Sequence, residues 1–542
     1  MCQNCKKIKN LTIFDVDISN YSVVCDKNAP DAVLTAVENF KKYIFDATGV
    51  QLSSSDYSEN SNQIVIGLDY CTSKKCEEAK EKVEHDGFAI VGDGDKLYIT
   101  AKIYRGVIFG VYAFLEEYVG VRFYSSRFSV IHQADKIEIP CDLCYISNPK
   151  MIYRNVYWMD VKHPSESNPQ FPLMLRDNTN EPDPLGDIGW YVGDEPKFCH
   201  TIIELAEMKH EVGLQPCLTD ENVFNTVLKN VRKWLKEYPK AKIISVAQND
   251  SWAHQLGCQC ENCRAIDEKE EASMGSYLTF INRIADAIKD DYPDVLVDTL
   301  AYRYTRKPPK TVVPRDNVIV RPCSIECCFC HPFDDPDCEA NVKFKNDLDG
   351  WTKIAKKMFV WDYTTNFHKY LLPFPNLYVL HKNMKFLYDH NVRGVFAQGN
   401  CQSLSAEFGE LRAYLLSKLM WNPEMSEKEY FAYMDEFLKD YYGAGWKRIR
   451  NYIDWSSEFC AKNTHSHCET TALALPIESK EECERILNEW KAAENEAETE
   501  VQKEHVRLSS VQFLSLCEHF PDFNFDFRKE KYDILKRNGI TY

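Results

Sequence analysis

Acidic and amide side chains follow two apolar, strand-like segments in the middle of the chain. Asn249 and Asp250 come directly after the segment at 242–248, and Glu326 comes directly after the segment at 317–325. A carboxyl group can donate or accept a proton at a reacting bond, and an amide can orient a polar group of a substrate. The two acids therefore predict a site for acid/base chemistry, with Asn249 beside one of them.

Other apolar segments end in residues that suit substrate binding. They supply these side chains: Arg154, Trp158, Tyr302, Tyr304, Trp361, Asp362, Tyr363 and Gln398. Any single Asp at such a position can instead cap the following helix. A protein with a purely structural role has little reason to place acids, amides and aromatic rings together at the ends of its strands. The whole set is therefore interpreted as a binding site.

The elements that carry these residues repeat as strand, loop and helix from about residue 150. Expected strands are 151–158, 213–219, 242–248, 295–302, 317–325, 357–363 and 392–398. Expected helices are 222–237, 273–291, 342–356 and 374–390. Near-continuous apolar strands that alternate with helices favour a parallel sheet covered by helices. Seven such strands predict an α/β fold, a (β/α)8 TIM barrel with its site at the carboxyl ends of the strands. A further strand between residues 160 and 212 is hard to place.

The chain is predicted to contain three domains. Residues 1–145 alternate strands and helices, with a helix that stops at Gly49 and a hairpin formed by GFAIV-GDGD-KLYITA, and predict a small α/β domain. Residues 146–423 form the barrel, and the charged, helix-patterned residues 424–542 form a helical C-terminal domain.

Composition excludes several classes of partner. A net charge of −17 and a pI near 5.4 argue against a nucleic-acid partner. No stretch reaches the roughly 18 apolar residues of a membrane span. The first residues lack the pattern of a signal peptide, so the 22 cysteines are expected to be mostly free thiols in a reducing cytoplasm. A secreted protein from which a signal peptide had been trimmed would look the same.

Two carboxyl groups at one barrel mouth suit the cleavage of glycosidic bonds. One acid protonates the leaving oxygen, and a second group attacks or stabilises the oxocarbenium-like centre. In some families the acetamido group of the substrate attacks instead, and the enzyme orients and polarises that amide. The pair Asn249 and Asp250 suits this task, and Glu326 could approach the sugar from its other side.

Long stretches of the sequence resemble glycoside hydrolase family 163. They include RGVIFGVYAFLEEYVGVRFY (105–124), SVAQNDSWAHQLGCQCENCRAID (245–267), TLAYRYTRKPP (299–309), SIECCFCHP (324–332) and FVWDYTTNFHKYLLPFPNL (359–377). The resemblance covers most of residues 100–423. It implies an endo-β-N-acetylglucosaminidase of N-glycans, a retaining, substrate-assisted mechanism and a β-hexosaminidase-like N-terminal domain. The β-hexosaminidases carry adjacent Asp and Glu where this chain has Asn249 and Asp250, which leaves the role of each group open.

The resemblance and the strand positions together suggest specific roles. Glu326 is predicted to be the general acid/base, while Asp250 with Asn249 polarises the acetamido group; the two acids could exchange these roles. Asp362 is expected to bind sugar hydroxyls. Tyr302, Trp361 and Tyr363 are expected to line the subsite, and Gln398 to contact the substrate. The last candidates for substrate binding, each of which can also be a packing or loop residue, are Arg154, Trp158, His200, His331 and Asn366.

Three cysteines, Cys258, Cys260 and Cys263, have a spacing at which thiolates can bind zinc. His254 or a cysteine from the group Cys323, Cys327, Cys328 and Cys330 could complete four ligands. Reduced thiols that brace a loop are the alternative, and no cofactor is expected. A zinc at these cysteines would be structural.

Two other functions remain open at this point. The same barrel could carry an exo-acting glycosidase, either β-hexosaminidase-like or α-glucuronidase-like, which needs a closed pocket. It could also be a non-catalytic glycan-binding protein, in which the acids would lie apart or point away from the mouth. The sequence contains no H-E-x-x-H motif, so a zinc hydrolase is disfavoured. The exact glycan and the oligomeric state are left open.

Overall fold

The computed structural model describes residues 7–540 except 180–184, 186–188, 194–196 and 253. The chain divides into two compact units, which are described separately. The first unit comprises residues 1–152, 160–187 and 420–422, and the second comprises 153–159, 188–419 and 423–542. The predicted helical domain at 424–542 therefore clusters with the predicted barrel.

The first unit is an α/β structure built on a mixed sheet of six strands in the order β11-β6-β7-β5-β3-β4. Its strands are β1 Ile8–Ile13, β2 Val16–Asp17, β3 Ser22–Cys25, β4 Ser53–Ser54, β5 Gln63–Ile66, β6 Phe88–Asp93, β7 Lys96–Thr100, β8 Val121–Ser125, β9 Phe128–Ile131, β10 Ala134–Ile139 and β11 Cys144–Ser147. Its helices are α1 Asp31–Thr48, α2 Lys74–Glu81, α3 Tyr104–Tyr118 and α5 Phe171–Met174, and α4 Met159–Lys162 begins at the boundary with the second unit.

Local sequence signals predicted this unit well. Helix α1 ends at Gly49, whose φ of 75° is a left-handed conformation that glycine adopts without steric cost. The hairpin is confirmed, because β6 and β7 pair antiparallel with Asp93 opposite Lys96. The apolar face of α3 is fully buried, as its near-continuous hydrophobic pattern requires.

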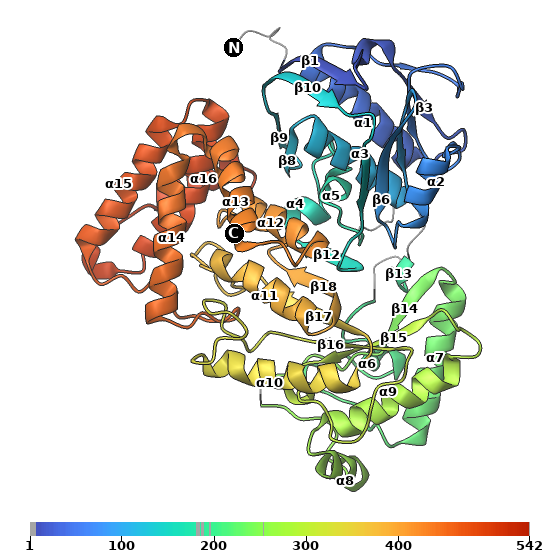
Figure 1. Cartoon of the computed structure of the whole chain (residues 1–542). Helices are drawn as coiled ribbons and strands as arrows, with labels where there is room; N and C mark the ends of the chain where they lie inside the picture. The colour runs from blue at the N-terminus through green and yellow to red at the C-terminus, as the bar shows by residue number, and fades with distance from the viewer. Residues whose placement is uncertain (1–6, 180–184, 186–188, 194–196, 253, 541–542) are drawn as a thin grey trace. The chain divides into compact units, whose positions relative to one another are not determined.

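The second unit contains a curled sheet of seven parallel strands in the order β12-β18-β17-β16-β15-β14-β13 (Figure 1). The strands are β12 Tyr153–Tyr157, β13 Gly189–Tyr191, β14 Ala241–Ser245, β15 Leu296–Ala301, β16 Val318–Pro322, β17 Met358–Tyr363 and β18 Val392–Gln398. Among the described residues the edge strands β12 and β13 share no ladder. The parallel α/β architecture is confirmed, and the sheet is a half-barrel where a closed eight-stranded barrel was predicted.

Helices alternate with these strands and then continue to the end of the described chain. They are α6 Ile202–Leu205, α7 Glu221–Glu237, α8 Glu261–Glu270, α9 Met274–Ile288, α10 Glu339–Ile354, α11 Leu377–Asp389, α12 Gly409–Trp421, α13 Glu427–Tyr442, α14 Trp446–Asn463, α15 Lys480–Glu496, α16 Glu500–Cys517 and α17 Arg528–Arg537. The four helices predicted between strands correspond to α7, α9, α10 and α11. Within the described part of the chain, no helix is both long and apolar enough to cross a membrane.

The strand predicted at 213–219 is wrong. This segment forms turns and irregular structure, and β13 takes the place beside β14. Gly213 has a φ of 87°, outside the strand region, and Pro216 has no amide hydrogen for a ladder. The polar groups of the segment instead bind the loop that follows β14, as described below.

A buried cation contacts aromatic rings on both edge strands of the sheet. The Arg321 guanidinium lies 5.7 Å from the ring of Tyr153 on β12 and 5.3 Å from the ring of Tyr191 on β13. Its ion partner is Asp298, at 3.3 Å, and neither side chain is exposed. Burial raises the pKa of Asp298 and lowers the pKa of Arg321. These cation–π contacts connect side chains of the two edge strands, β12 and β13.

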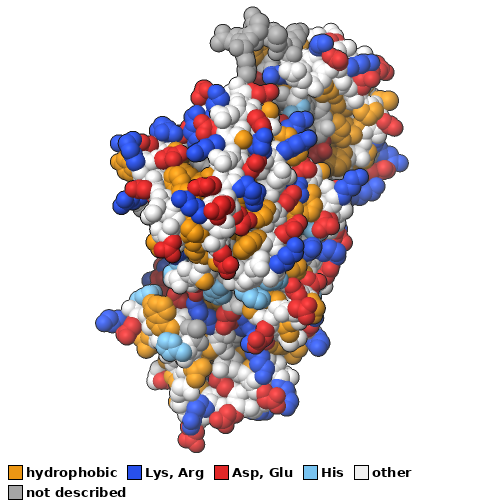
Figure 2. All heavy atoms as spheres, turned by 90° about the vertical axis from the view of Figure 1, so that its left-hand side faces the viewer, with side chains coloured by type: hydrophobic (Ala, Val, Ile, Leu, Met, Phe, Trp, Pro, Cys, Tyr) orange, Lys and Arg blue, Asp and Glu red, His pale blue; other side chains and the backbone are white. Residues whose placement is uncertain are grey.

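The cysteines are mostly free thiols, as expected. Two disulfides, Cys71–Cys76 and Cys330–Cys460, join described residues. On the face shown in Figure 2, basic and acidic side chains are interspersed and do not gather by sign. That face lacks the continuous basic surface that a nucleic acid would need.

Candidate active site

A cavity of about 200 Å³ opens at the carboxyl ends of the strands in the second unit. Its wall is made of His200, Asp250, Leu300, Tyr302, Cys323, Ile325, Trp361, Tyr363, Phe367, Gln398 and Glu469. Most of these residues end or follow strands β13 to β18, where parallel α/β folds place their active sites. The structure therefore brings together five residues predicted to bind substrate, His200, Tyr302, Trp361, Tyr363 and Gln398, with the predicted acid Asp250.

Two carboxylates of the cavity are joined by one hydrogen-bonded chain. The Tyr302 hydroxyl donates to Oδ1 of Asp250 at 3.1 Å and accepts from Nε of Arg303 at 2.7 Å. The same guanidinium donates to Oε2 of Glu469 at 3.1 Å, with Arg303 11% and Glu469 35% exposed. Burial raises the pKa of Tyr302, so its hydroxyl remains a donor to Asp250. Asp250 and Glu469 are thereby held at fixed positions around the same space.

The residue before Asp250 has a positioning role. The Asn249 side chain is buried, and its amide donates to the carbonyl oxygens of Glu211 and Leu214 at 2.7 and 3.0 Å. The backbone of Asp250 accepts from the Gly213 amide at 2.8 Å. The segment that was predicted to be a strand thus anchors the end of β14. Asn249 does not line the cavity, so its predicted contact with a substrate stays a prediction that this geometry disfavours.

His200 lines the cavity, and one of its ring nitrogens is bound to the backbone. Its Nδ1 lies 2.8 Å from the carbonyl oxygen of Gln248, so Nδ1 carries the proton and Nε2 is left as an acceptor in a neutral ring. The residue has a φ of 52°, a left-handed conformation that non-glycine residues adopt at a cost of about 1–3 kcal/mol. This strained turn, after β13, aims the ring at the cavity.

The aromatic part of the wall is rigid. Nε1 of Trp361 donates to Oε1 of Gln398 at 2.7 Å, and the indole packs against Phe396 and Phe198 with ring centroids 4.3 and 5.5 Å away. A ring held on several sides loses little conformational entropy when a ligand binds. The apolar face of a sugar can stack on such a ring.

Glu469 is a cavity residue that the sequence did not suggest. It lies between α14 and α15, far from any strand end in the sequence. Two hydrogen bonds attach its segment to the loop after β17: the Phe367 amide donates to the Cys468 carbonyl at 2.8 Å, and Nδ2 of Asn366 donates to the Thr470 carbonyl at 3.0 Å. Asn366, a predicted binding residue, thus holds the segment that carries Glu469. No local pattern marks this carboxylate, because only the tertiary fold brings it to the cavity.

The other two predicted acids point elsewhere. Glu326 is 40% exposed and pairs with Arg306 at 2.7 Å, and Arg306 also pairs with Asp347 at 2.7 Å. Asp362 alternates with the cavity residues Trp361 and Tyr363 along β17 and accepts from the Ser324 hydroxyl at 2.7 Å. Burial raises the pKa of Asp362 to about 6. Neither acid lines the cavity, and their predicted roles remain predictions.

Three further candidates do not line the cavity. The Trp158 indole donates to the Thr364 hydroxyl at 3.1 Å and is buried. Arg154 is buried as well. His331 contacts Cys328 and the Ala461 carbonyl, outside the cavity wall. Trp158 and Arg154 are buried packing residues in this structure, His331 lies outside the cavity wall, and the predicted contact of each with a substrate stays a prediction.

The fold of this chain is similar to that of a solved glucuronidase structure. A family GH115 4-O-methyl-α-glucuronidase with specificity for decorated arabinogalactans, BtGH115A, superposes with a TM-score of 0.57 at 11% identity, covering 98% of this chain and 76% of that one. CpGH84B gives 0.46 at 12% identity, over 96% of this chain and 93% of its own. A GH138 enzyme targeting pectin rhamnogalacturonan II gives 0.41 at 11%, over 95% and 89%. The first likeness establishes a fold shared with a glycoside hydrolase.

The family of the chain is defined by sequence. Residues 123–454, more than half of the chain, match the family described as Domain of unknown function (DUF4838), and the protein belongs to it. No curated protein matches the sequence significantly. Both predicted acids and the strands that carry the cavity lie within the matched residues, whereas Glu469 lies beyond them.

Proposed function

We propose that the protein is a glycoside hydrolase and that the cavity at the strand ends is its active site. The observation that carries this proposal is the chain Asp250–Tyr302–Arg303–Glu469, which holds two carboxylates around one small space beside a fixed tryptophan. Two carboxyl groups at one sugar site are what most glycosidases use. The shared fold with a GH115 glycosidase supports the class of reaction.

We further propose a substrate-assisted, retaining mechanism on β-N-acetylglucosaminyl linkages, in which Glu469 is the acid/base. Glu469 gives its proton to the glycosidic oxygen as the bond to C1 breaks, and the acetamido oxygen of the substrate closes on C1. Asp250 accepts a hydrogen bond from the acetamido N–H and stabilises the positive charge of the resulting ring. Water then attacks C1, returns a proton to Glu469 and reopens the ring. Glu469 is preferred to Glu326 for this role because Glu469 lines the cavity, whereas Glu326 lies outside its wall.

The wall of the cavity favours a neutral sugar with an apolar substituent. Leu300, Cys323 and Ile325 supply an apolar surface beside Trp361, which suits the methyl group of an acetamide. A glucuronate would bring a second negative charge next to Asp250, and like charges at one site repel each other.

The first test compares two substrates and two variants. A complex-type N-glycoprotein reports endo action if the wild type releases glycan and leaves one N-acetylglucosamine on the protein. An aryl β-N-acetylglucosaminide reports exo action. Folded Asp250→Asn and Glu469→Gln variants should lose activity on whichever substrate the wild type cleaves.

The likeness to BtGH115A makes an α-glucuronidase the second candidate. Cleavage of an aryl α-glucuronide in preference to the N-acetylglucosaminide would replace the proposed substrate and keep the proposed class. Specific glycan binding without hydrolysis of any of the three substrates would contradict the enzymatic proposal.

A further inference from the structure

Four cysteines of the second unit converge on one point. They are Cys217, which precedes α7, and Cys258, Cys260 and Cys263, which lie before and within the first turn of α8. Their sulfur atoms all lie within 4.8 Å of one another. The sequence spacing identified three of them, but Cys217 is 41 residues before Cys258 and only the fold brings it there.

The distances fit one tetrahedral ion. Sγ of Cys217 lies 3.7 Å from Sγ of Cys260 and 4.0 Å from Sγ of Cys263. Four thiolates at about 2.3 Å from a zinc ion have sulfur atoms about 3.8 Å apart. A disulfide would instead require sulfur atoms about 2.05 Å apart. The four sulfur atoms therefore have the separation of ligands around a metal.

Hydrogen-bond donors lie next to three of the four sulfur atoms. The Cys263 amide donates to Sγ of Cys260 at 3.4 Å, and the Thr219 hydroxyl lies 3.4 Å from the sulfur atoms of Cys217 and Cys263. Cys260 also caps the N-terminus of α8, where the helix dipole favours negative charge. Donors aimed at the sulfur atoms are the outer contacts that tune thiolate–metal sites.

We propose that Cys217, Cys258, Cys260 and Cys263 bind a structural Zn²⁺ ion. All four positions are filled by protein, so the ion has no place for a substrate. The bound ion would join the loop after β14 to the segment at 213–217. That segment already anchors the end of β14, because Gly213 binds Asp250 and the Gln215 side chain donates to the Asn249 carbonyl at 2.9 Å.

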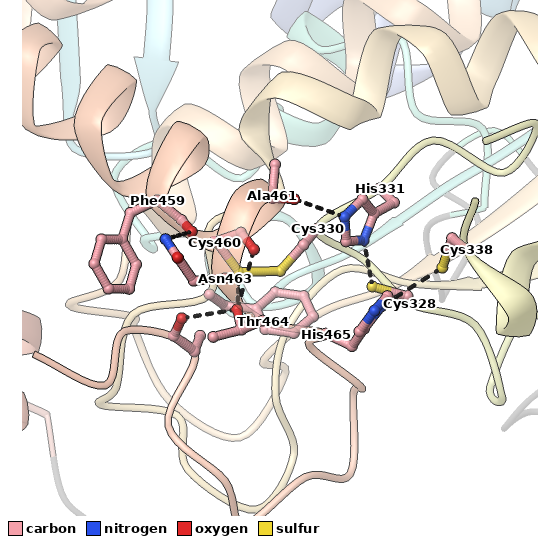
Figure 3. The surroundings of a disulfide bond; sticks show 12 residues. Cys328, Cys330, His331, Cys338, Phe459, Cys460, Ala461, Asn463, Thr464 and His465 are labelled. Carbon is pink, nitrogen blue, oxygen red and sulfur yellow. Dashed lines mark hydrogen bonds between the residues drawn. A yellow bond between two sulfur atoms is a disulfide. The ribbon is translucent and has the colours of Figure 1, made fainter. Parts of the chain in front are cut away.

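A second, separate group of four side chains has the arrangement of metal ligands. Cys328, His331, Cys338 and His465 have ligand atoms within 4.8 Å of one another. Nδ1 of His331 lies 3.2 Å from Sγ of Cys328, and Nδ1 of His465 lies 3.7 Å from Sγ of Cys338. A nitrogen and a sulfur ligand of one tetrahedral zinc ion are about 3.6 Å apart. Figure 3 shows the two imidazoles directed at the two sulfur atoms, next to the Cys330–Cys460 disulfide.

The tautomer of His331 suits a metal ligand. Its Nε2 donates to the Ala461 carbonyl at 2.9 Å, which leaves Nδ1 as the acceptor that faces Cys328 (Figure 3). We infer that this set of two cysteines and two histidines binds a second structural Zn²⁺. Such an ion would connect the loop after β16 to the segment that begins at His465 and carries Glu469 to the cavity.

Both sites are tested by the zinc content of the full-length protein, purified under reducing conditions without chelator. Elemental analysis should give two zinc ions per chain for the wild type, one each for Cys260→Ser and Cys338→Ser, and two for the control Cys25→Ser. Cys25 is a free cysteine on β3 in the first unit. Metal content is measured without substrate, so this result is independent of the proposed function.

The possible outcomes separate the two sites. Cys260→Ser protein that retains two zinc ions would overturn the four-cysteine site, and Cys338→Ser protein that does so would overturn the site of mixed cysteine and histidine ligands. Wild type that neither contains nor takes up Zn²⁺, or that contains iron instead, overturns both. If a variant fails to fold, wild type loaded with Co²⁺ decides the matter, because sulfur-to-cobalt charge transfer grows with the number of thiolates. A spectrum without this absorption would also overturn both.

Discussion

The loops after β14 and β16 are built alike and serve the cavity differently. Each follows a buried parallel strand, carries a predicted catalytic acid and contributes to a cluster of metal-type ligands. Asp250, after β14, lines the cavity, whereas Glu326, after β16, is held outside the wall by Arg306. Glu469 lines the cavity instead, and it comes from the segment between α14 and α15 that is hydrogen-bonded to the loop after β17. A strand end thus determines where an acid is placed, but its hydrogen-bond and ion partners determine whether it faces the cavity.

The largest loss of activity is expected from a substitution of Asp250, which follows β14. Asp250→Asn removes the negative charge that, in the proposed mechanism, stabilises the transition state. It keeps the shape of the side chain and an oxygen that can accept from Tyr302. We expect kcat/KM to fall by about 10³-fold on every substrate, whatever its leaving group. The measurement is steady-state kinetics with a matched series of aryl glycosides. Activity within about threefold of the wild type would remove Asp250 from the proposed mechanism.

The second prediction compares Glu469 with Glu326. Glu469→Gln removes the proposed proton donor, so activity should fall by about 10²-fold on substrates with poor leaving groups and much less on activated aryl glycosides. Glu326→Gln serves as the matched control, because it makes the same chemical change at a carboxylate outside the cavity. We expect it to remain within about threefold of the wild type, since Arg306 keeps Asp347 as a partner.

The reverse pattern would restore the role predicted from the sequence. If Glu326→Gln showed the dependence on leaving group and Glu469→Gln did not, the acid/base would be Glu326. A loop movement on substrate binding would then have to release it from Arg306.

This comparison also explains how far the sequence could be interpreted. Apolar periodicity located six of the seven parallel strands, and strand ends identified Asp250, Tyr302, Trp361, Tyr363 and Gln398. The short strand β13 has only three residues and gives almost no periodic signal. Glu469 and Cys217 lie on segments without regular structure, so their places depend on tertiary contacts that no local pattern records. Glu326 and Asp362 were correctly placed near strand ends, but the orientation of each side chain was set by Arg306 and Ser324.

The third prediction tests whether the two proposed zinc sites hold Asp250 and Glu469 in position. Cys260→Ser loosens the loop after β14, and we expect kcat/KM to fall by about 10-fold on all substrates. This loss should have the same lack of dependence on the leaving group as the loss in Asp250→Asn, but it should be smaller. Cys338→Ser loosens the segment that carries Glu469, so its loss should be confined to poor leaving groups. Equal losses with the same dependence on leaving group would mean that the clusters stabilise the fold without positioning the two acids separately.

The smallest effect on activity, and a distinct effect on stability, is expected at Asp362. Its pKa is raised to about 6 when folded, so the folded state binds a proton that the unfolded state releases between about pH 6 and pH 4. The contribution of Asp362 to the free energy of unfolding of the wild type therefore rises as the pH falls through this window, because this side chain takes up its proton more readily in the folded state. Asp362→Asn does not titrate, and its free energy of unfolding relative to the wild type should drop by about 2–3 kcal/mol between about pH 8 and pH 4.

Urea unfolding of both proteins across this range measures the difference, and any constant offset from the new amide leaves its slope unchanged. KM should also stay unchanged in this variant, because the side chain binds Ser324 and lies outside the wall of the cavity. A flat difference in stability together with a raised KM would mean that Asp362 faces the sugar, as the sequence alone predicted. The end of β17 would then resemble the end of β14, and the contrast between the acid that faces the cavity and the acids held away from it would no longer hold.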